Sequence, residues 1–219
     1  MQRARPDAPH RWSIDALASE PWRNGAGLTR LLAAEHDAHG LLWRISIADL
    51  AREAPFSAFD AIDRHAVLLS GAGLTLVDAH PAGAGQPAPA PIHFDAIGAI
   101  RAFAGEAALQ ACLGDVPARL FNVMTRRGAW RADLQVHTCT APGPGRPVGT
   151  ATPPQLEVLL VLDGSLLVCQ PGGVFSLGAG HGLWQRGGFD ATLGWQAADA
   201  ATRWLHLRLA PCADPATPT

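Results

Sequence analysis

The pattern of apolar and polar positions along this chain predicts β-strands rather than helices. Short apolar runs interrupted by Gly, Pro and Asp recur at residues 41–50, 65–79, 156–170 and 202–210, whereas apolar residues at helical spacing are scarce. Short runs of this kind, bounded by turn residues, are typical of barrels and sandwiches. The expected fold class is therefore all-β, with short helices only near DALASE and EAALQACLG.

An internal similarity indicates that one β-unit occurs twice. Segment 68–77, LLSGAGLTLV, matches segment 160–168, LVLDGSLLV, as two apolar strands joined by a glycine turn. Each is expected to form a β-hairpin, because glycine reaches the positive φ that tight turns need. A weaker match follows each copy, at 99–109 and at 173–184. Tandem repetition explains these matches, although two unrelated apolar hairpins would also look alike.

Two stretches rich in Pro and Gly interrupt the strands. TAPGPGRPVGTATPPQ cannot form a helix or a central strand and lies between the copies, so it is expected to be a linker. The stretch at 80–91 is followed by strand-like sequence and is expected to be an insertion. We therefore expect an N-terminal unit at 1–140, a linker at 141–154 and a C-terminal unit at 155–219, with strand exchange between the halves left open.

Composition narrows the functional classes. Of the 219 residues, 48% are hydrophobic and 16% charged, which is typical of a compact globular chain. The formal net charge of −2 offers no net positive field, so neither nucleic acid nor a membrane is expected as a partner. Lys and Tyr are absent, which excludes lysine Schiff-base chemistry and acid catalysis by tyrosine.

The expected location is cytoplasmic. No apolar run follows the early arginines as a secretory signal requires, and no stretch has the length of a membrane span. The cysteines lie far apart without a CxxC pair, as expected of unpaired thiols in a reducing compartment, and occupy positions Cys112, Cys139, Cys169 and Cys212.

Candidate metal and catalytic groups are few. Metal sites inside β-barrels commonly use a His-x-His motif with a nearby Glu, and this motif is absent. His36 and His39 lie in a polar turn and are expected to be solvated. In the cluster Asp60, Asp63 and His65, strand alternation turns the last two to one face, a weak arrangement for a cation. The GxSxG pattern of a serine nucleophile is missing. The phosphate-loop pattern is missing as well, so no metal or other cofactor is expected.

The remaining candidates are arginines and amides set in apolar strands, such as Arg44, Arg64, Asn122 and Arg126. A strand arginine costs free energy unless its guanidinium group is paired. Such positions therefore face water, a carboxylate partner or a ligand. Each arginine taken singly is equally well explained by exposure or by an internal salt bridge.

Three segments together resemble the HutD/Ves family of bicupins. They are PWRNGAGLTRLLA at 21–33, residues 41–76 around WRISIA and PFSAF, and residues 103–128 around FNVMTRRG, with a looser match at 155–210. The resemblance implies two tandem cupin-type barrels, a pocket in the first barrel, and a link either to histidine utilisation or to a stress response. One departure is the GAG at 25–27, where the family commonly has three glycines.

Carried over by matching motif, the resemblance implies a pocket lined by Asn24, Thr29, Arg44, Ser57, Phe59, Asp63, Arg64, Asn122 and Arg126. Its arginines would bind a carboxylate, and Phe59 or Trp43 would form a wall for a flat ligand. The expected function is a non-enzymatic regulator or sensor that binds a small carboxylate such as urocanate or formylglutamate, with the C-terminal barrel as a scaffold.

Two other classes of function stay open. A metal-independent isomerase or hydrolase would act on the same acids with Asp60, Asp63 or His65 as its base. An interaction module would use its edge strands or the 80–91 insertion. Because cupin barrels pair through sheet edges, a homodimer is one expected outcome, although pairing within the chain would reduce the need for it.

Overall fold

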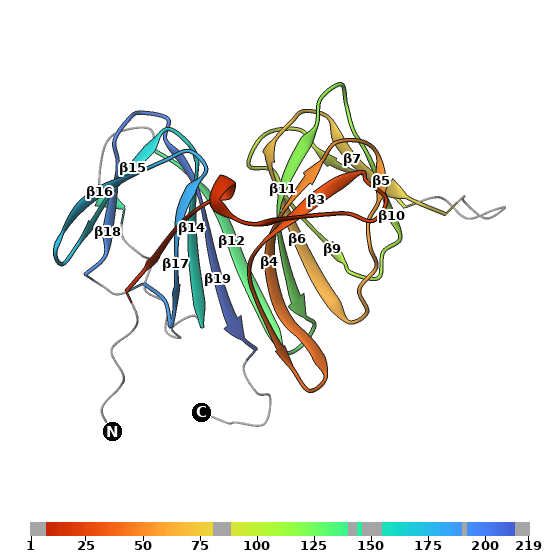
Figure 1. Ribbon diagram of the computed structural model, residues 1–219, viewed down its shortest axis with the longest axis horizontal. Coiled ribbons are helices and arrows are strands. Elements are labelled where there is room, and N and C mark those ends of the chain that lie inside the picture. Colours follow the sequence, from red (N-terminus) through yellow and green to blue (C-terminus); the bar gives the residue numbers. More distant parts are fainter. Residues whose placement is uncertain (1–7, 81–88, 140–143, 146–154, 190–191, 213–219) are drawn as a thin grey trace. The chain divides into compact units, whose positions relative to one another are not determined.

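The chain folds into antiparallel β-strands that form two compact units (Figure 1). The computed structural model describes residues 8–80, 89–139, 144–145, 155–189 and 192–212. The N-terminal unit is Leu17–Trp130, and the C-terminal unit combines Met1–Ala16 with Arg131–Thr219. Within the described ranges, the one helical element is the 3-10 turn η1 (Ile14–Ala16). The all-β class is confirmed. Near DALASE the helix is limited to this turn, and the helix expected at EAALQACLG is wrong, because that segment contains a strand.

The N-terminal unit contains two sheets. The larger has six strands in the order β2 (Ser19–Pro21), β3 (Gly27–Asp37), β4 (Gly40–Leu50), β11 (Ala118–Arg126), β6 (Ile62–Ser70) and β9 (Ile100–Ala104). The smaller has four, in the order β5 (Ala54–Pro55), β10 (Leu109–Cys112), β7 (Leu74–Asp78) and β8 (Ile92–Phe94). Aliphatic and aromatic side chains from both sheets, including Leu68, Leu74, Phe94 and Leu120, form one fully buried core.

The C-terminal unit is also made of two sheets. The larger has the order β1 (His10–Ser13), β17 (His181–Arg186), β14 (Leu156–Asp163), β19 (Arg203–Pro211) and β12 (Trp130–Thr138). The smaller has the order β13 (Pro144–Gly145), β18 (Gly194–Ala197), β15 (Ser165–Gln170) and β16 (Gly173–Gly178). Its core includes Leu159, Leu166, Leu183 and Trp195.

The strand orders show that one topology occurs twice. The N-terminal unit contains the runs β4-β11-β6-β9 and β5-β10-β7-β8, and the C-terminal unit contains β12-β19-β14-β17 and β13-β18-β15-β16. Each strand of the second set follows its counterpart by the same step in the numbering. The expected repetition of one β-unit is therefore present, but no described sheet closes on itself, so closed tandem barrels are not seen.

The two segments expected to be β-hairpins are corners between sheets. Segment 68–77 contains the end of β6 and the start of β7, which belong to different sheets, and 160–168 relates β14 to β15 in the same way. The glycine geometry is as expected, with φ of +99° at Gly71 and +71° at Gly164. A Cβ on Gly164 would lie 2.6 Å from Oγ1 of Thr202, so this corner requires glycine. A glycine between two apolar strands therefore predicts a reversal of the chain, but not which strands pair.

The units divide at a different place from the one expected. Both β1 and β12 lie in the large sheet of the C-terminal unit, so the chain start is exchanged into the later half. Trp12 of β1 is buried there. The expected linker at 141–154 lies outside the described residues except for Pro144–Gly145, and the expected insertion lies outside them over 81–88.

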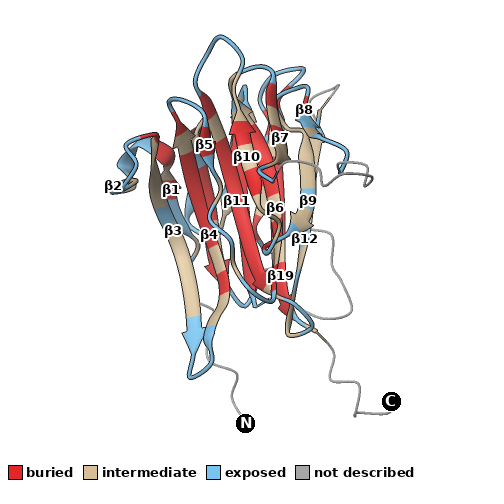
Figure 2. Ribbon diagram, turned by 90° about the vertical axis from the view of Figure 1, so that its right-hand side faces the viewer, coloured by how far each residue is buried: buried red, intermediate tan, exposed pale blue. Residues whose placement is uncertain are grey.

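Burial follows the middle strands of the six-stranded sheet, β4, β11 and β6 (Figure 2). Among the described cysteines, Cys169 is exposed and the others are partly buried, and none forms a disulfide. No helix in the described ranges is long and apolar enough to cross a membrane.

Candidate functional site

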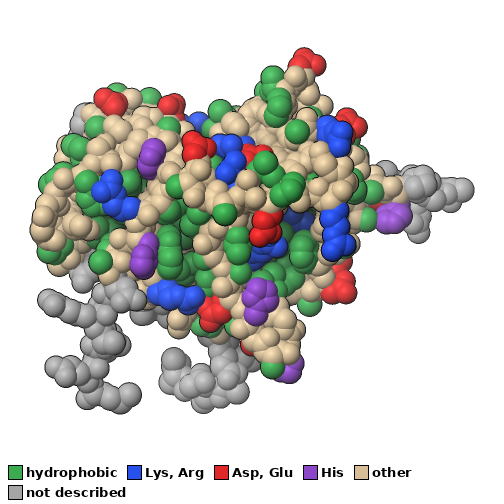
Figure 3. All heavy atoms as spheres, viewed as in Figure 1, with side chains coloured by type: hydrophobic (Ala, Val, Ile, Leu, Met, Phe, Trp, Pro, Cys, Tyr) green, Lys and Arg blue, Asp and Glu red, His purple; other side chains and the backbone are tan. Residues whose placement is uncertain are grey.

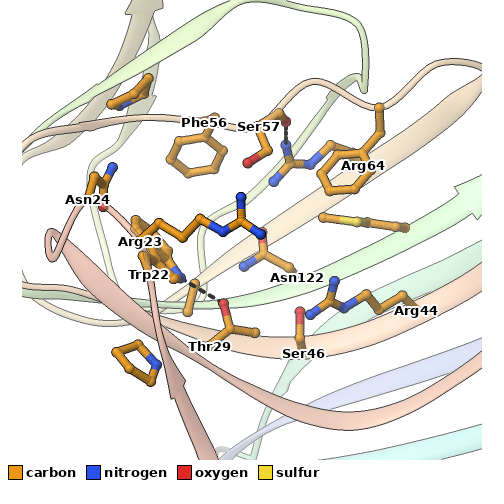
Figure 4. A pocket seen from close by; sticks show the side chains of 15 residues that line it. Trp22, Arg23, Asn24, Thr29, Arg44, Ser46, Phe56, Ser57, Arg64 and Asn122 are labelled. Carbon is orange, nitrogen blue, oxygen red and sulfur yellow. Dashed lines mark hydrogen bonds between the residues drawn. The ribbon is translucent and has the colours of Figure 1, made fainter.

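A cavity lies in the N-terminal unit. Its volume of about 450 Å³ is within the usual range for small-molecule sites. Its walls come from the large sheet, the turn before β3 and the segment after β5 (Figure 4). The lining residues are Pro21, Trp22, Arg23, Asn24, Thr29, Arg44, Ser46, Ala48, Pro55, Phe56, Ser57, Phe59, Arg64, Asn122 and Met124.

The floor of the cavity is formed by alternate residues of β4, β11 and β6. Arg44 and Ser46 of β4 lie on one face of their strand, two residues apart, as the β-pleat dictates. On β11, Asn122 pairs with Ser46, and Met124 pairs with both Arg44 and Arg64. Because side chains of paired residues share a face, two arginines flank one methionine in a single cross-strand row.

Arg64 is a buried cation that has no acidic partner among the described residues. Its side chain is 5% exposed, its Nη1 donates to the carbonyl oxygen of Ser57 at 3.0 Å, and its Nε has no hydrogen-bond partner among the described residues. Three rings lie 5.0–5.6 Å from its guanidinium carbon, those of Phe56, Phe59 and Phe103. Burial, together with the charge of Arg44, lowers the pKa of Arg64 to about 10, so the group is still a cation at neutral pH. An anion at this point would compensate a buried charge.

Two more polar groups of the floor lack partners in the part of the chain that the structure describes. They are Oδ1 of Asn122, which is 4% exposed, and Nε of the half-buried Arg44. Buried polar atoms are nearly always hydrogen-bonded in folded proteins. The floor is therefore suited to a ligand that has an anionic group for the arginines and an N–H or O–H donor for Asn122.

A tight turn forms the rim. The N–H of Gly25 donates to the carbonyl oxygen of Trp22 at 2.9 Å, and the N–H of Ala26 donates to Oδ1 of Asn24 at 3.0 Å. The indole Nε1 of Trp22 donates to Oγ1 of Thr29 at 2.8 Å. Asn24 and Thr29 thus line the cavity while their side-chain oxygens stabilise the turn. The turn accommodates the buried side chain of Ala26.

Most of the residues expected from motif matching come together in this cavity. Those that line it are Asn24, Thr29, Arg44, Ser57, Phe59, Arg64 and Asn122. Sequence reasoning missed Arg23, although it stands in the quoted PWRNGAG motif. It also missed Ser46 and Met124, which strand alternation would have placed beside Arg44 and Asn122.

Asp63 and Arg126, also expected in the pocket, do not line it. Arg126 donates from both Nη atoms to the carboxylate of Asp37 at 2.7 and 2.8 Å, as a bidentate ion pair. Asp63 accepts from Nε of Arg127 at 2.7 Å. Strand alternation explains why Asp63 does not line the cavity, because its side chain points to the face of β6 opposite that of Arg64. Trp43 forms no wall either, since it is 1% exposed and contacts Trp130.

No carboxylate, imidazole or thiol is found among the residues that line the cavity. The candidate bases Asp60, Asp63 and His65 lie elsewhere, and burial lowers the pKa of His65, which shares the face of Asp63. His36 and His39 are exposed, as expected. Within the described residues, no group of three or more His, Cys, Asp or Glu side chains is placed to hold a metal ion.

An ion-pair network holds the end of the segment that carries Phe56 to Phe59. Glu106 accepts hydrogen bonds of 2.9 Å from both Nη atoms of Arg127 and from the N–H of Ala61. Ala61 has a φ of +56°, a conformation that costs free energy for a residue with a Cβ. The hydrogen bonds from Arg127, supported by backbone N–H groups, lower the pKa of Glu106 to about 2.

Replacing Glu106 by Gln is expected to lower the melting temperature at neutral pH. The folded pKa of about 2 lies below the ordinary value of 4.5, so the stabilisation is complete above pH 4.5 and is lost as the pH falls towards 2. The difference in melting temperature between the wild type and Glu106→Gln should therefore close over this pH range. Glu53→Gln, at an exposed position of the same unit, is the control. A difference that stays constant down to pH 2 would contradict this account.

Comparison with known families and relatives gives consistent matches. A family model described as HutD matches residues 15–202. The protein Ves of Cronobacter sakazakii is 36% identical over 120 residues, and an uncharacterised 21.2 kDa protein in the hutC 3′ region of Pseudomonas putida is 35% identical over 118 residues. These alignments cover 52% of this chain and 59% and 57% of the relatives, so the chain spans less than two thirds of the length of these curated relatives.

Similar solved structures extend over nearly the whole chain. HutD from Pseudomonas fluorescens SBW25 matches with a TM-score of 0.70 at 21% identity, covering 94% of this chain and 100% of that one. A conserved protein of unknown function from Pseudomonas aeruginosa PAO1 matches with a TM-score of 0.72 at 23% identity, covering 93% and 100%. A cupin 2 conserved barrel domain protein from Leptotrichia buccalis matches with a TM-score of 0.55 at 11% identity, covering 94% and 98%. At these identities the likeness shows a cupin-like fold.

Proposed function

This chain belongs to the HutD family, and we propose that it is a non-enzymatic regulator or sensor whose N-terminal unit binds a small carboxylate in the cavity of Figure 4. The observation that carries the proposal is the buried guanidinium of Arg64, which faces a cavity lined by further arginines and has no acidic partner in the ranges that the structure describes. Hydrogen bonds between a guanidinium and a carboxylate group are charge-assisted and often bidentate, which makes them stronger than hydrogen bonds between neutral groups.

The proposed ligands are acids of histidine utilisation, such as urocanate or formylglutamate. The family supports this choice, as does the similarity to a protein whose description places it in the hutC region of Pseudomonas putida. The similarity to Ves proteins keeps a role in a stress response as an alternative setting for the same site. Either role would be exercised in the cytoplasm.

The lining of the cavity favours binding over turnover. Proton transfer in an isomerase or hydrolase needs a side chain such as Asp, Glu or His within hydrogen-bonding distance of the substrate. The residues expected to serve as such a base do not line the cavity, and the lining offers arginines, amides, hydroxyls and aromatic rings. These groups can hold an acid in place but are poor proton acceptors at neutral pH.

No nucleic acid or membrane partner is part of this proposal. On the face shown in Figure 3, basic and acidic side chains are intermixed, in keeping with the formal net charge of −2. Long-range attraction to a polyanion requires a concentrated positive field. A homodimer stays a prediction.

Calorimetry with urocanate, formylglutamate and glutamate tests the proposal. At least one acid should bind with a dissociation constant well below 1 mM, and NMR should show the ligand unchanged after long incubation. The control variant Arg101→Gln removes a charge that is paired with Asp95 outside the cavity. It should bind the same acid as tightly as the wild type does. Silence from all three acids at millimolar concentration would overturn the binding proposal, and product formation would show an enzyme instead.

A further inference from the structure

Strand β16 (Gly173–Gly178) is a sheet edge without the usual protection. An exposed edge can pair with a strand of another chain unless short length, charge or proline prevents it. The four described sheets have eight edge strands. Of these, β2, β5, β8 and β13 are three residues long or shorter, and β1, β9 and β12 each carry an arginine. Strand β16 alone among them is longer, with the sequence GVFSLG and neither a charge nor a proline.

The outer edge of β16 has no strand beside it in the ranges that the structure describes. On its inner edge, β16 pairs with β15 along its full length, and it is the last strand of its sheet (Figure 1). Its residues form no further backbone hydrogen bond with any described residue. The backbone groups of an edge strand point alternately to the two sides, so about half of the N–H and C=O groups of β16 are left for another strand.

The outer face beside this edge is apolar and uncharged. Val174 is 64% exposed, the highest value among the exposed large hydrophobic residues of the described chain, and Leu167 of β15 is 37% exposed. Across the two strands, Val174 pairs with the exposed Cys169, and Leu167 pairs with the exposed Ser176. Because paired residues share a face, these four side chains form one neutral strip along β15 and β16.

The free edge of β16 is complementary to the same edge of a second copy. Like charges placed opposite each other on paired strands are destabilising, and β16 brings none to such a pairing. Antiparallel pairing of β16 with itself about a two-fold axis uses the free edge of both copies, so assembly stops at a dimer. The cation Arg11 lies over the ring of Phe175, which pairs with the buried Val168 and so faces the core, away from the strip.

We propose that the protein forms a two-fold homodimer in which the β16 strands of two copies pair antiparallel. The two four-stranded sheets then become one continuous sheet, and Val174 of each copy is covered at the junction. The paired segment is short, so the interface lies at the small end of specific interfaces, with a dissociation constant in the range of about 1–100 μM. This proposal does not depend on the proposed function, because β16 and the lining of the cavity belong to different units.

Analytical ultracentrifugation of the full chain tests the proposal. Over a concentration range of about 1–200 μM, the wild type should change from monomer to dimer. Val174→Lys should raise the dissociation constant about ten-fold or more, because each copy would bring a positive charge to the junction. Ser176→Lys, at an exposed position of the same strip, should act in the same direction. Both positions are exposed, so the melting temperature of either variant at low concentration should equal that of the wild type.

Leu31→Lys is the matched control. Leu31 is 46% exposed on β3, which lies between β2 and β4 and is therefore not an edge strand, so this variant should dimerise as the wild type does. Hydrogen exchange locates the contact, because the amides of residues 173–178 should exchange more slowly at high protein concentration in the wild type but not in Val174→Lys.

Four results would overturn the proposal. The wild type could stay monomeric over the whole range, or its dimer could persist unchanged in both strip variants. The control Leu31→Lys could lose the dimer as fully as Val174→Lys does. Finally, the wild type could dimerise without slower exchange at residues 173–178, which would place the contact on another surface.

Discussion

Replacing Arg64 by Met is expected to weaken carboxylate binding by at least about 30-fold without destabilising the fold. Removing one partner of a desolvated, hydrogen-bonded charge pair costs about 2–5 kcal/mol of binding free energy, which corresponds to this loss of affinity or more. Among the residues that the structure describes, the guanidinium of Arg64 is buried without a carboxylate partner, and its one hydrogen bond is to Ser57. Loss of that bond costs about 1 kcal/mol and is offset because no charge is left buried.

Calorimetry and urea unfolding separate these two effects. Arg64→Met should lose binding while its free energy of unfolding stays within about 1 kcal/mol of the wild-type value. Arg64→Lys should bind with intermediate affinity, because an ammonium group keeps the charge but not the bidentate geometry. Arg101→Met serves as the control for loss of an arginine on the neighbouring strand β9. If Arg64→Met unfolds several kcal/mol more easily than the wild type, Arg64 has a structural role and the argument for an anion site is lost.

Replacing His206 by Phe is expected to destabilise the C-terminal unit by about 3 kcal/mol. The carboxylate of Glu157 is 2% exposed and is bonded to Nε2 of His206 at 2.6 Å and to the N–H of Phe189 at 2.7 Å. Arg208 is more distant, with its Nε 3.9 Å from the carboxylate. Removing the imidazole would leave a buried carboxylate without its nearest partner, and breaking such pairs typically costs about 3–5 kcal/mol.

A second variant distinguishes a buried charge from lost packing. In the double variant Glu157→Gln with His206→Phe, the neutral amide still accepts the bond from Phe189, so most of the lost stability should return. Urea unfolding monitored by tryptophan fluorescence measures both variants. Carboxylate binding should be unchanged in each, because every lining residue belongs to the N-terminal unit. A double variant as unstable as the single one would show that the ring of His206 matters for its shape alone.

The two copies of the repeated topology differ in how they hold a buried ionic side chain. Strand β6 corresponds to β14, and Arg64 and Glu157 are the buried ionic residues near the starts of these strands. Arg64 pairs across the sheet with Met124, whereas Glu157 pairs with Arg208. The buried charge of the C-terminal unit thus finds its partners inside the protein, and that of the N-terminal unit does not. This contrast supports one carboxylate site per chain, with the C-terminal unit as a scaffold.

Local sequence determined the all-β class, the repeated unit and the type of chemistry, because alternation, glycine positions and residue types are properties of neighbouring residues. The resemblance to the HutD/Ves family, carried by matching motifs, also implied that Arg44, Arg64 and Asn122 lie together. Tertiary structure decided which arginine is left for a ligand: Arg126 is neutralised by Asp37, 89 residues away, whereas within the described part of the chain Arg64 meets a carbonyl oxygen and aromatic rings. It likewise turned the expected hairpins into corners between sheets. Strand pairing joins residues distant in the chain, and short-range patterns carry no information about which partner a strand or a charge will meet.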